Sequence, residues 1–257
     1  MEKLVTFEKQ DGFATVKINN PPLNVLGSKV VEQLHDVFTT IASDPDIIVV
    51  ILTGAGDRAF MAGADIKEFP EKLGGNMKSG SIKTHETLNL IASLHKPTIA
   101  MLNGITLGGG CELALTCDFR IAEEHVQIGL PEIKLGIFPG GGGTQRLPRL
   151  IGKTKAKELM FTGDPLTAQE AKEIGLVSTV VPKGKGMEEA GKLAKRIARH
   201  SLDALAMIKQ AVDEGMEKPI ADAIQLESDL FQEVFQTKGA KEGVQAFLEK
   251  RTPQFNR

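Results

Sequence analysis

An unbroken apolar segment, Ile47–Leu52, constrains the fold of this chain more than any other feature of its sequence. A strand with one face in water alternates apolar and polar residues, whereas a strand covered on both faces is apolar throughout. Two further segments, Thr98–Leu102 and Phe119–Ala122, are interpreted as buried strands of the same kind. Strands of this kind belong to sheets with helices packed on either side. We therefore predict an α/β fold with a mainly parallel sheet.

Helical segments and one hairpin alternate with these strands. Leu4–Lys9 and Phe13–Asn19 are expected to be two strands joined at Asp11-Gly12, a dipeptide typical of hairpin turns. Helices are expected over Ser28–Ala42, with Ser28 as the N-cap, and over about Ser81–Leu94. The alternation predicts a sheet wound in repeated ββα turns.

The second half of the chain is mainly helical. One short strand, Val177–Val181, interrupts segments whose apolar residues recur at helical spacing. The expected helices are Thr154–Phe161, Ala168–Ile174, Met187–Ala198, Leu202–Glu214, Pro219–Phe235 and Lys241–Lys250. The loop Pro70–Gly80 contains three glycines and few apolar residues. It is interpreted either as a surface loop or as a flap over a substrate pocket.

The composition argues against several classes of protein. Of the 257 residues, 41% are apolar and 25% are charged, which is typical of a globular chain that buries a full core. The formal net charge of -2 argues against nucleic acid and anionic membranes as partners. No apolar segment is long enough for a signal peptide or a membrane span. The two cysteines, Cys111 and Cys117, lack zinc or redox spacing, so we expect a reducing, cytoplasmic setting.

Three loops rich in small residues are the candidate functional segments. Two of them, residues 59–67 and 103–112, come after predicted strands, where open α/β sheets bind ligands. Small residues let a substrate approach backbone amides, and Gly63–Ala64 and Gly108–Gly110 could each supply an N–H group to an oxyanion hole. The same glycines are also compatible with close packing of a helix on a sheet. We interpret the run Gly140–Gly143, in the third loop, as tight packing of this kind.

Two carboxylates in these loops are candidates for acid–base chemistry. Glu112 lies in the first turn of an otherwise apolar helix, and Glu132 follows Pro131 in a largely apolar segment. A carboxyl group in apolar surroundings holds its proton more tightly, which suits proton transfer near neutral pH. Two carboxyl groups at one site would also push their pKa values apart. Either residue alone is more often an N-terminal helix acid or a salt-bridged core residue than a catalytic group, and spacing does not show that they face each other.

No metal or redox cofactor is predicted. The five histidines lack metal-ligand spacing. Gly54–Ala59 matches a dinucleotide fingerprint, but a loop of small residues follows it instead of a clear helix, so nicotinamide binding is not favoured. Cys111 has no histidine close in the sequence to activate it, and we interpret it as a buried small side chain.

Three stretches of the chain resemble the signature segments of a known family. They are AFMAGADIKEF from Ala59, NGITLGGGCELALTCDFRIA from Asn103 and GLPEIKLGIFPGGGGTQRLPRLIG from Gly129. Their order and spacing resemble the crotonase superfamily, in particular enoyl-CoA hydratases, and the resemblance runs from about Leu4 to Phe255. It implies a crotonase-like spiral of ββα turns with the active site over residues 1–195. It also implies a C-terminal α-helical trimerisation region over residues 196–257.

The resemblance also implies roles for individual residues. In hydratases of this superfamily, two amides form the oxyanion hole, here those of Ala64 and Gly109, and two glutamates are catalytic, here Glu112 and Glu132. Relatives with other activities often lack one of the two acids, and this chain keeps both. The residues that would contact coenzyme A are Ala62, Gly63, Asp65, Ile66 and Lys67, together with Phe247 and Lys250 acting on a neighbouring subunit. Lys67 is also compatible with a solvated surface position.

The function that the resemblance implies is reversible addition of water to a 2-enoyl-CoA, giving a 3-hydroxyacyl-CoA. Such a step serves fatty-acid oxidation and related lipid metabolism, and it needs no cofactor because coenzyme A is part of the substrate. Two alternatives stay open: an enoyl-CoA isomerase or another crotonase-type acyl-CoA enzyme, and a non-catalytic acyl-CoA- or RNA-binding protein. The expected assembly is a homotrimer or a homohexamer built from two trimers.

Overall fold

The larger of two sheets forms the centre of the molecule. The computed structural model describes residues 2–69 and 78–255, so most of the loop Pro70–Gly80 lies outside the described residues. Within that part of the chain, the larger sheet has the strand order β1 (Val5–Gln10), β2 (Phe13–Ile18), β3 (Val49–Gly54), β5 (Thr98–Leu102), β7 (Phe119–Glu123) and β10 (Thr179–Val181). β1 and β2 form the predicted antiparallel hairpin, and every other neighbouring pair is parallel.

A second, smaller sheet was not predicted. Its order is β4 (Ala59–Ala62), β6 (Ile105–Leu107), β8 (Gln127–Gly129) and β9 (Leu166–Thr167), with the first three strands parallel. Each turn of the spiral gives one strand to each sheet, in the pairs β3 and β4, β5 and β6, and β7 and β8. The predicted ββα winding is therefore confirmed. The short strands escaped prediction because two to four residues carry no readable alternation.

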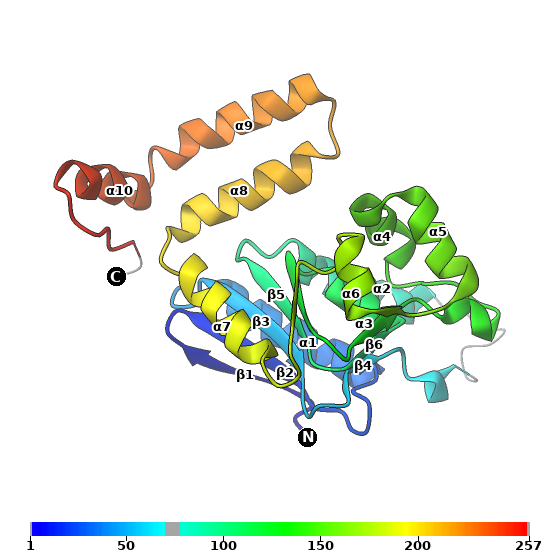
Figure 1. Ribbon diagram of the computed structural model, residues 1–257. Helices are drawn as coiled ribbons and strands as arrows, with labels where there is room; N and C mark the ends of the chain where they lie inside the picture. Colours follow the sequence, from blue (N-terminus) through cyan, green and yellow to red (C-terminus); the bar gives the residue numbers. More distant parts are fainter. Residues whose placement is uncertain (1, 70–77, 256–257) are drawn as a thin grey trace.

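Helices α1 (Ser28–Ser43) and α7 (Gly186–Ile197) cover opposite faces of the larger sheet (Figure 1). The other helices of the spiral are α2 (Lys78–Ala92), α3 (Gly109–Ala114), α4 (Gly143–Ile151), α5 (Lys153–Thr162) and α6 (Ala168–Glu173), with single 3₁₀ turns at η1 (Ile66–Glu68) and η3 (Glu132–Leu135). The expected N-cap Ser28 is wrong: Gly27 is the N-cap, and the Ser28 hydroxyl donates to Glu68 at 2.7 Å. Helix α4 was not predicted, because it begins in a glycine run and contains Pro148.

Strand β3 shows why an unbroken apolar segment was informative. All of its residues are buried. Val49 and Ile51 belong to a cluster with Ala190 and Ala194 of α7. The alternate residues of the strand join the other cluster, which contains the buried face of α1. Because consecutive side chains of a strand point to opposite faces, apolar residues at every position mean a helix on each side.

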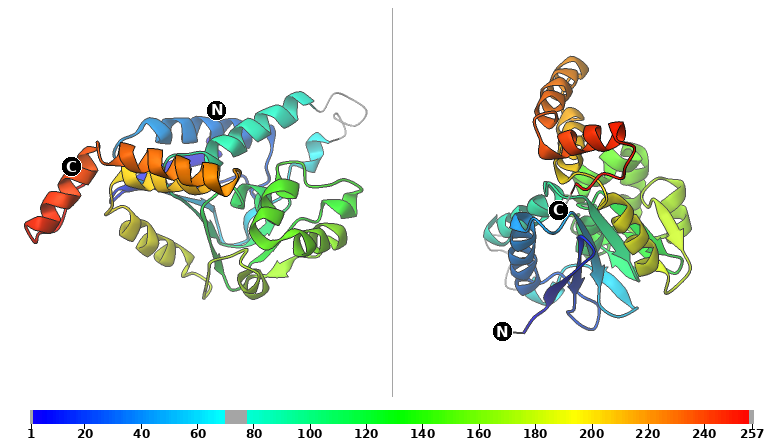
Figure 2. Two further views of the ribbon diagram at one scale, coloured as in Figure 1. Left: turned by 90° about the horizontal axis from the view of Figure 1, so that it is seen from above. Right: turned by 90° about the vertical axis from the view of Figure 1, so that its left-hand side faces the viewer.

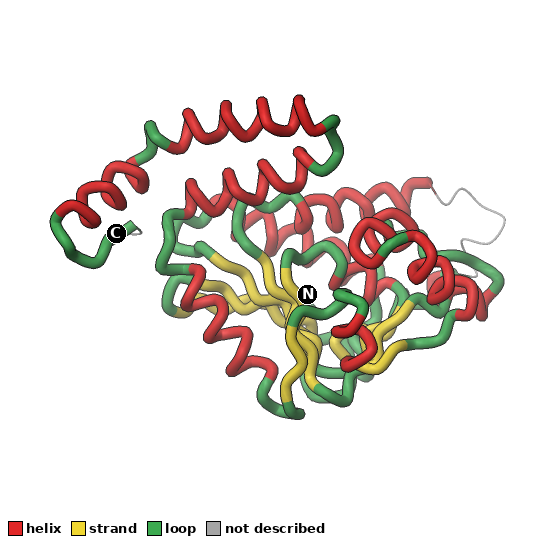
Figure 3. Tube along the Cα trace, turned by 45° about the horizontal axis from the view of Figure 1, so that its top comes forward, coloured by secondary structure: helices red, strands yellow, loops and turns green. Residues whose placement is uncertain are grey.

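Three C-terminal helices extend from the spiral as an arm (Figures 1 and 2). They are α8 (Leu202–Gly215), α9 (Ile220–Val234) and α10 (Lys238–Leu248), and α8 and α9 run side by side (Figure 3). Lys209 of α8 forms an ion pair with Asp118 at 3.0 Å, which ties the arm to the end of the larger sheet. The division of the chain at residues 195 and 196 stays a prediction. None of the helices in the described part of the chain is long and apolar enough to cross a membrane.

Candidate active site

The candidate site lies at the carboxyl ends of the short strands β4, β6 and β8. Gly63 and Ala64 follow β4, Gly108 and Gly109 follow β6, and Glu132 comes shortly after β8. The amide of Gly108 donates to the carbonyl of Gly129 at 2.9 Å, which joins the ends of two of these strands. Parallel strands bring their carboxyl ends to one edge, so the small sheet assembles three separate loops. The sequence predicted that the first two loops follow the strands now called β3 and β5. In the structure they follow the next strands along the chain, β4 and β6.

Close packing of glycines places two backbone amides side by side. A Cβ atom built on Gly109 would lie 3.5 Å from the amide nitrogen of Ala64. Gly110 packs against the carbonyl of Met61 with no room for a side chain, so the close-packing interpretation is correct for this glycine. Within residues 2–69 and 78–255, neither the Ala64 nor the Gly109 amide donates a hydrogen bond. The two N–H groups are therefore available to a bound group.

Glu112 is held by the glycine run that precedes α4. Its side chain is buried, with 4% exposure, and its Oε1 accepts hydrogen bonds from the amides of Gly141 at 2.7 Å and Gly143 at 2.8 Å. Burial raises the pKa of Glu112, and the two amide hydrogen bonds oppose that shift because they favour the ionised form. Both bonds go to one oxygen, which fixes the orientation of the carboxylate.

Glu132 has a different environment from Glu112. It follows Pro131 in the turn η3, and its Oε2 is a buried oxygen without a hydrogen-bond partner among the described residues. Burial raises the pKa of Glu132 to about 7, and the charge of Glu112 adds to the shift. A Cβ atom built on Gly108 would lie 3.1 Å from Oε1 of Glu132, so this carboxyl group lies against the beginning of α3. The pair therefore combines a clamped carboxylate with one that can hold a proton near neutral pH.

The segment predicted to contact coenzyme A has one clear structural role. Asp65 is the N-cap of η1, and its side chain accepts from the amide of Lys67 at 3.1 Å. Ile66 and Lys67 are exposed, and Ala62 and Gly63 are half-buried. Phe247 is 82% exposed on α10, and Lys250 follows that helix. In Figures 1 and 2, α10 lies at the opposite end of the molecule from η1, so one chain does not bring the two groups together.

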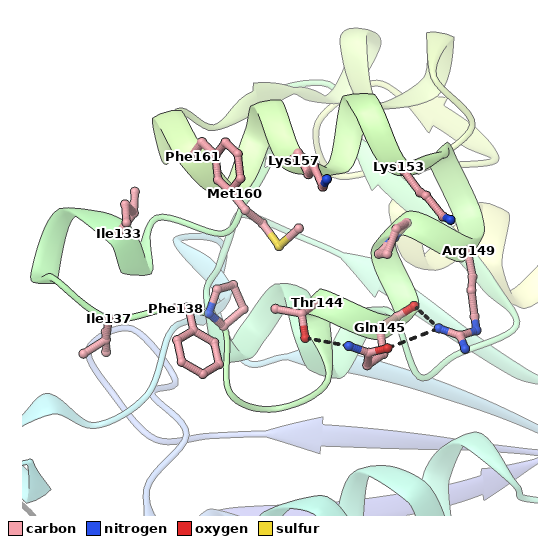
Figure 4. A pocket seen from close by; sticks show the side chains of 12 residues that line it. Ile133, Ile137, Phe138, Thr144, Gln145, Arg149, Lys153, Lys157, Met160 and Phe161 are labelled. Carbon is pink, nitrogen blue, oxygen red and sulfur yellow. Dashed lines mark hydrogen bonds between the residues drawn. The ribbon is translucent and has the colours of Figure 1, made fainter.

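Two cavities lie beside α4. The first, of about 550 Å³, is lined mainly by apolar side chains that include Ile133, Phe138, Met160 and Phe161 (Figure 4). The second, of about 400 Å³, is polar and lies between α2 and α4; its lining includes His85, Asn89 and Arg146. Neither catalytic candidate, Glu112 or Glu132, lines either cavity. No cluster of three potential metal ligands exists within residues 2–69 and 78–255.

Sequence reasoning missed the residues that hold Glu112. Gly141 and Gly143 were interpreted as packing glycines, although their amides bind the carboxylate. The available signal was a run of four glycines opening a helix, which exposes several free N–H groups. The sequence contained nothing that paired this run with a glutamate 29 residues away.

An α/β spiral with two unlike carboxyl groups beside free amides defines a class of acid–base enzymes. The chain belongs to the enoyl-CoA hydratase/isomerase family, which it matches over residues 8–257. It is 42% identical to a crotonyl-CoA hydratase of Syntrophomonas wolfei, over 98% of this chain and 97% of the relative. It is also 42% identical to a short-chain-enoyl-CoA hydratase of Clostridium acetobutylicum, over 96% and 95% of the two chains.

Solved structures confirm the predicted fold. An enoyl-CoA hydratase from Bacillus anthracis matches with a TM-score of 0.93 and 41% identity over 99% of both chains. A structure from Geobacillus kaustophilus matches with a TM-score of 0.94 and 37% identity, over 99% of this chain and 97% of that one. The crotonase-like spiral with its C-terminal helices is therefore the fold of this chain.

Proposed function

We propose that this chain is an enoyl-CoA hydratase that adds water reversibly to a 2-enoyl-CoA, giving a 3-hydroxyacyl-CoA. Family membership and relatives with that activity in their names support the reaction class. The observation that carries the proposal is the unlike pair of carboxyl groups. Glu112 is clamped by two amides, whereas the pKa of Glu132 is raised to about 7. The two carboxyl groups thus differ in their surroundings, as a general acid and a general base acting at one site require.

The amides of Ala64 and Gly109 are the proposed oxyanion hole. Negative charge develops on the thioester oxygen when water attacks the β-carbon of the substrate. Two N–H groups directed at that oxygen bind the charged state more tightly than the ground state, which accelerates the reaction. Their adjacency and lack of other hydrogen bonds within the described residues support this assignment.

The two glutamates divide the proton transfers. Glu112 takes a proton from water while the water oxygen bonds to the β-carbon. Glu132 delivers a proton to the α-carbon, where the electron pair of the double bond is left. In dehydration the two roles exchange. The thioester itself supplies the electron sink, so we propose that no metal or redox cofactor takes part.

Substitution of each glutamate tests this assignment. We expect Glu112→Gln and Glu132→Gln each to lower kcat for crotonyl-CoA hydration by at least about 100-fold, because each removes one proton transfer. Loss of the enoyl absorbance measures the rate, and circular dichroism checks the fold. Glu158→Gln, which changes an exposed acid paired with Lys155, is the matched control and should keep wild-type activity. Near wild-type turnover by both active-site variants would remove the assignment.

A comparison of substrates separates hydration from isomerisation. The family also contains isomerases, and one shuttling base such as Glu132 suffices to move a double bond. We expect 2-enoyl-CoA hydration to be much faster than conversion of the matching 3-enoyl-CoA. The relatives named for crotonyl-CoA and short-chain substrates make a four-carbon substrate the first to test. Faster turnover of the 3-enoyl isomer would favour the isomerase.

The coenzyme A contacts and the assembly are part of the same proposal. Lys67 and the neighbouring backbone would bind coenzyme A from one subunit, and Phe247 and Lys250 from the next. Exposed apolar residues along the arm, which include Ile220 at 76% and Phe231 at 63%, support association into trimers or hexamers. Light scattering should give the mass of three or six chains, and a stable monomer would contradict the proposal. We also propose a cytoplasmic location.

A further inference from the structure

The loop that clamps Glu112 is itself held by one arginine. Gly141 and Gly143 donate to the carboxylate, and Gly142 lies between them. Arg146, one turn into α4, donates from Nη1 to the carbonyl of Gly141 at 3.1 Å. Its backbone amide donates to the carbonyl of Gly142 at 2.9 Å. A single residue thus fixes the two peptide carbonyls that lie between the donors to Glu112.

The same guanidinium connects the loop to a second helix. Nη2 of Arg146 donates to the side-chain oxygen of Asn89 on α2 at 2.6 Å. A Cβ atom built on Gly142 would collide with the guanidinium, so Arg146 packs directly against the clamp. Arg146 is half-buried, and this burial lowers its pKa. The planar fork of arginine suits this bridge, because it directs separate N–H groups to two acceptors at once.

We propose that Arg146 is a positioning residue for the general base: it bridges Asn89 and the Gly141 carbonyl and so aligns the two amides that orient Glu112. This inference rests on the proposed role of Glu112. Arg146 itself touches neither the carboxylate nor a reacting atom; it acts through the loop. A small displacement of the amide donors would misalign the carboxylate with the attacking water and lower the rate.

Arg146 also acts on Glu112 through its charge. The ionisable groups that influence or share this site are His85 on α2, Cys111 on α3, Glu132 on η3 and Arg146 on α4. His85 and Arg146 both lower the pKa of Glu112, against the larger effect of burial. Loss of the positive charge would therefore raise that pKa, and weakening of the two amide hydrogen bonds would raise it as well. A substitution that keeps the charge isolates the effect of the amides.

Arg146→Lys and Arg146→Gln test the proposal through kcat, KM and the pH profile of crotonyl-CoA hydration. Arg146→Lys keeps the charge but loses the fork, so we expect kcat to fall by about 10- to 100-fold, with KM little changed. The acid limb of its pH profile should move to higher pH, because the amide hydrogen bonds to Glu112 weaken. Arg146→Gln should lose at least as much in kcat. Its acid limb should move to higher pH than that of Arg146→Lys, because Glu112 then also loses the nearby cation.

Arg149→Gln is the matched control. Arg149 lies one turn further along α4, carries the same charge and pairs with Glu217 at 2.9 Å on the surface. This variant should keep the wild-type kcat and pH profile. Because Arg146 lines the polar cavity of about 400 Å³, added guanidinium ion should also restore part of the activity of Arg146→Ala. A purely structural role would give neither a selective loss in kcat nor this rescue.

The outcomes distinguish this inference from the proposed function. Wild-type kcat in Arg146→Lys and Arg146→Gln would overturn the role of Arg146, while a loss in Glu112→Gln would still support the base. Full activity of Glu112→Gln would instead overturn the base and the inference with it. If Arg146→Gln does not fold, Asn89→Leu removes the outer anchor and should also lower kcat selectively. An unchanged kcat in that variant and in Arg146→Lys would overturn the inference.

Discussion

At the scale of single residues, two glutamates acquire different chemistry from their surroundings. Both are shielded from water, which raises both pKa values. Glu112 recovers part of this cost through two amide hydrogen bonds, whereas Oε2 of Glu132 is buried without a partner among the described residues. The unpartnered oxygen is where a proton is most easily held. In the proposed mechanism, environment rather than residue type therefore separates the acid from the base.

The pH dependence of hydration follows from this difference. Glu132 must carry a proton to act as the acid, and its pKa is about 7, so kcat/KM should fall as pH rises through about 7. Glu112 must be ionised, and its pKa is raised, so the acid limb should lie above the ordinary range of a carboxyl group. Initial rates with crotonyl-CoA across a pH series measure both limbs. Glu132→Gln should lack the alkaline limb; a flat wild-type profile across the neutral range would contradict this assignment.

At the scale of secondary-structure elements, short segments place the chemistry. Strands β4, β6 and β8 each contribute only three or four residues, yet their ends carry the two amides and Glu132. Helix α3 supplies Glu112, and the segment that opens α4 supplies its donors. Long elements such as α1 and β3 form the core, while these short ones assemble the site. The geometry of the base therefore depends on the contact between α3 and the loop before α4.

Gly141→Ala tests that contact. A Cβ atom at this position would lie 2.6 Å from Oε2 of Glu112, so the loop or the carboxylate must move. We expect kcat for crotonyl-CoA to fall by about 100-fold, because a displacement near 1 Å can have that effect, while KM changes little. The control is Gly191→Ala on α7, where an added Cβ meets nothing within 4 Å and activity should be unchanged. Equal kcat values for the two variants would show that the contact does not matter.

At the scale of the whole molecule, much of the apolar surface of the arm of α8, α9 and α10 is left exposed by the described part of the chain. Phe231 and Phe235 pack edge to face with ring centroids 5.0 Å apart, yet both are more than half exposed. Phe247 belongs to α10, which lies at the end of the arm away from the spiral (Figure 1). These features support the proposal that neighbouring subunits cover the arm and complete the coenzyme A site.

Phe231→Asp tests the proposed assembly. A charge placed in a buried apolar contact should cost about 2 kcal/mol or more at each interface, so light scattering should show dissociation toward monomers. Gln232→Asp adds the same charge at the adjacent exposed position of α9 and is the control. KM for the CoA substrate should rise as the oligomer dissociates. An unchanged mass for Phe231→Asp would place the subunit contact elsewhere.

The sequence by itself determined the class of fold and indicated Glu112 and Glu132 as the candidate acids. The apolar segment now seen in β3 required cover on both faces, and the Asp11-Gly12 turn required a hairpin; both are local patterns that short stretches of chain express fully. The family resemblance then assigned Glu112 and Glu132 as a pair.

Only the tertiary structure decided how the site is assembled. The small sheet has strands too short to show a pattern, and the clamp on Glu112 joins residues 29 and 31 positions apart. Such contacts depend on the path of the whole chain, because hydrogen bonds between distant loops leave no periodic signal in the sequence.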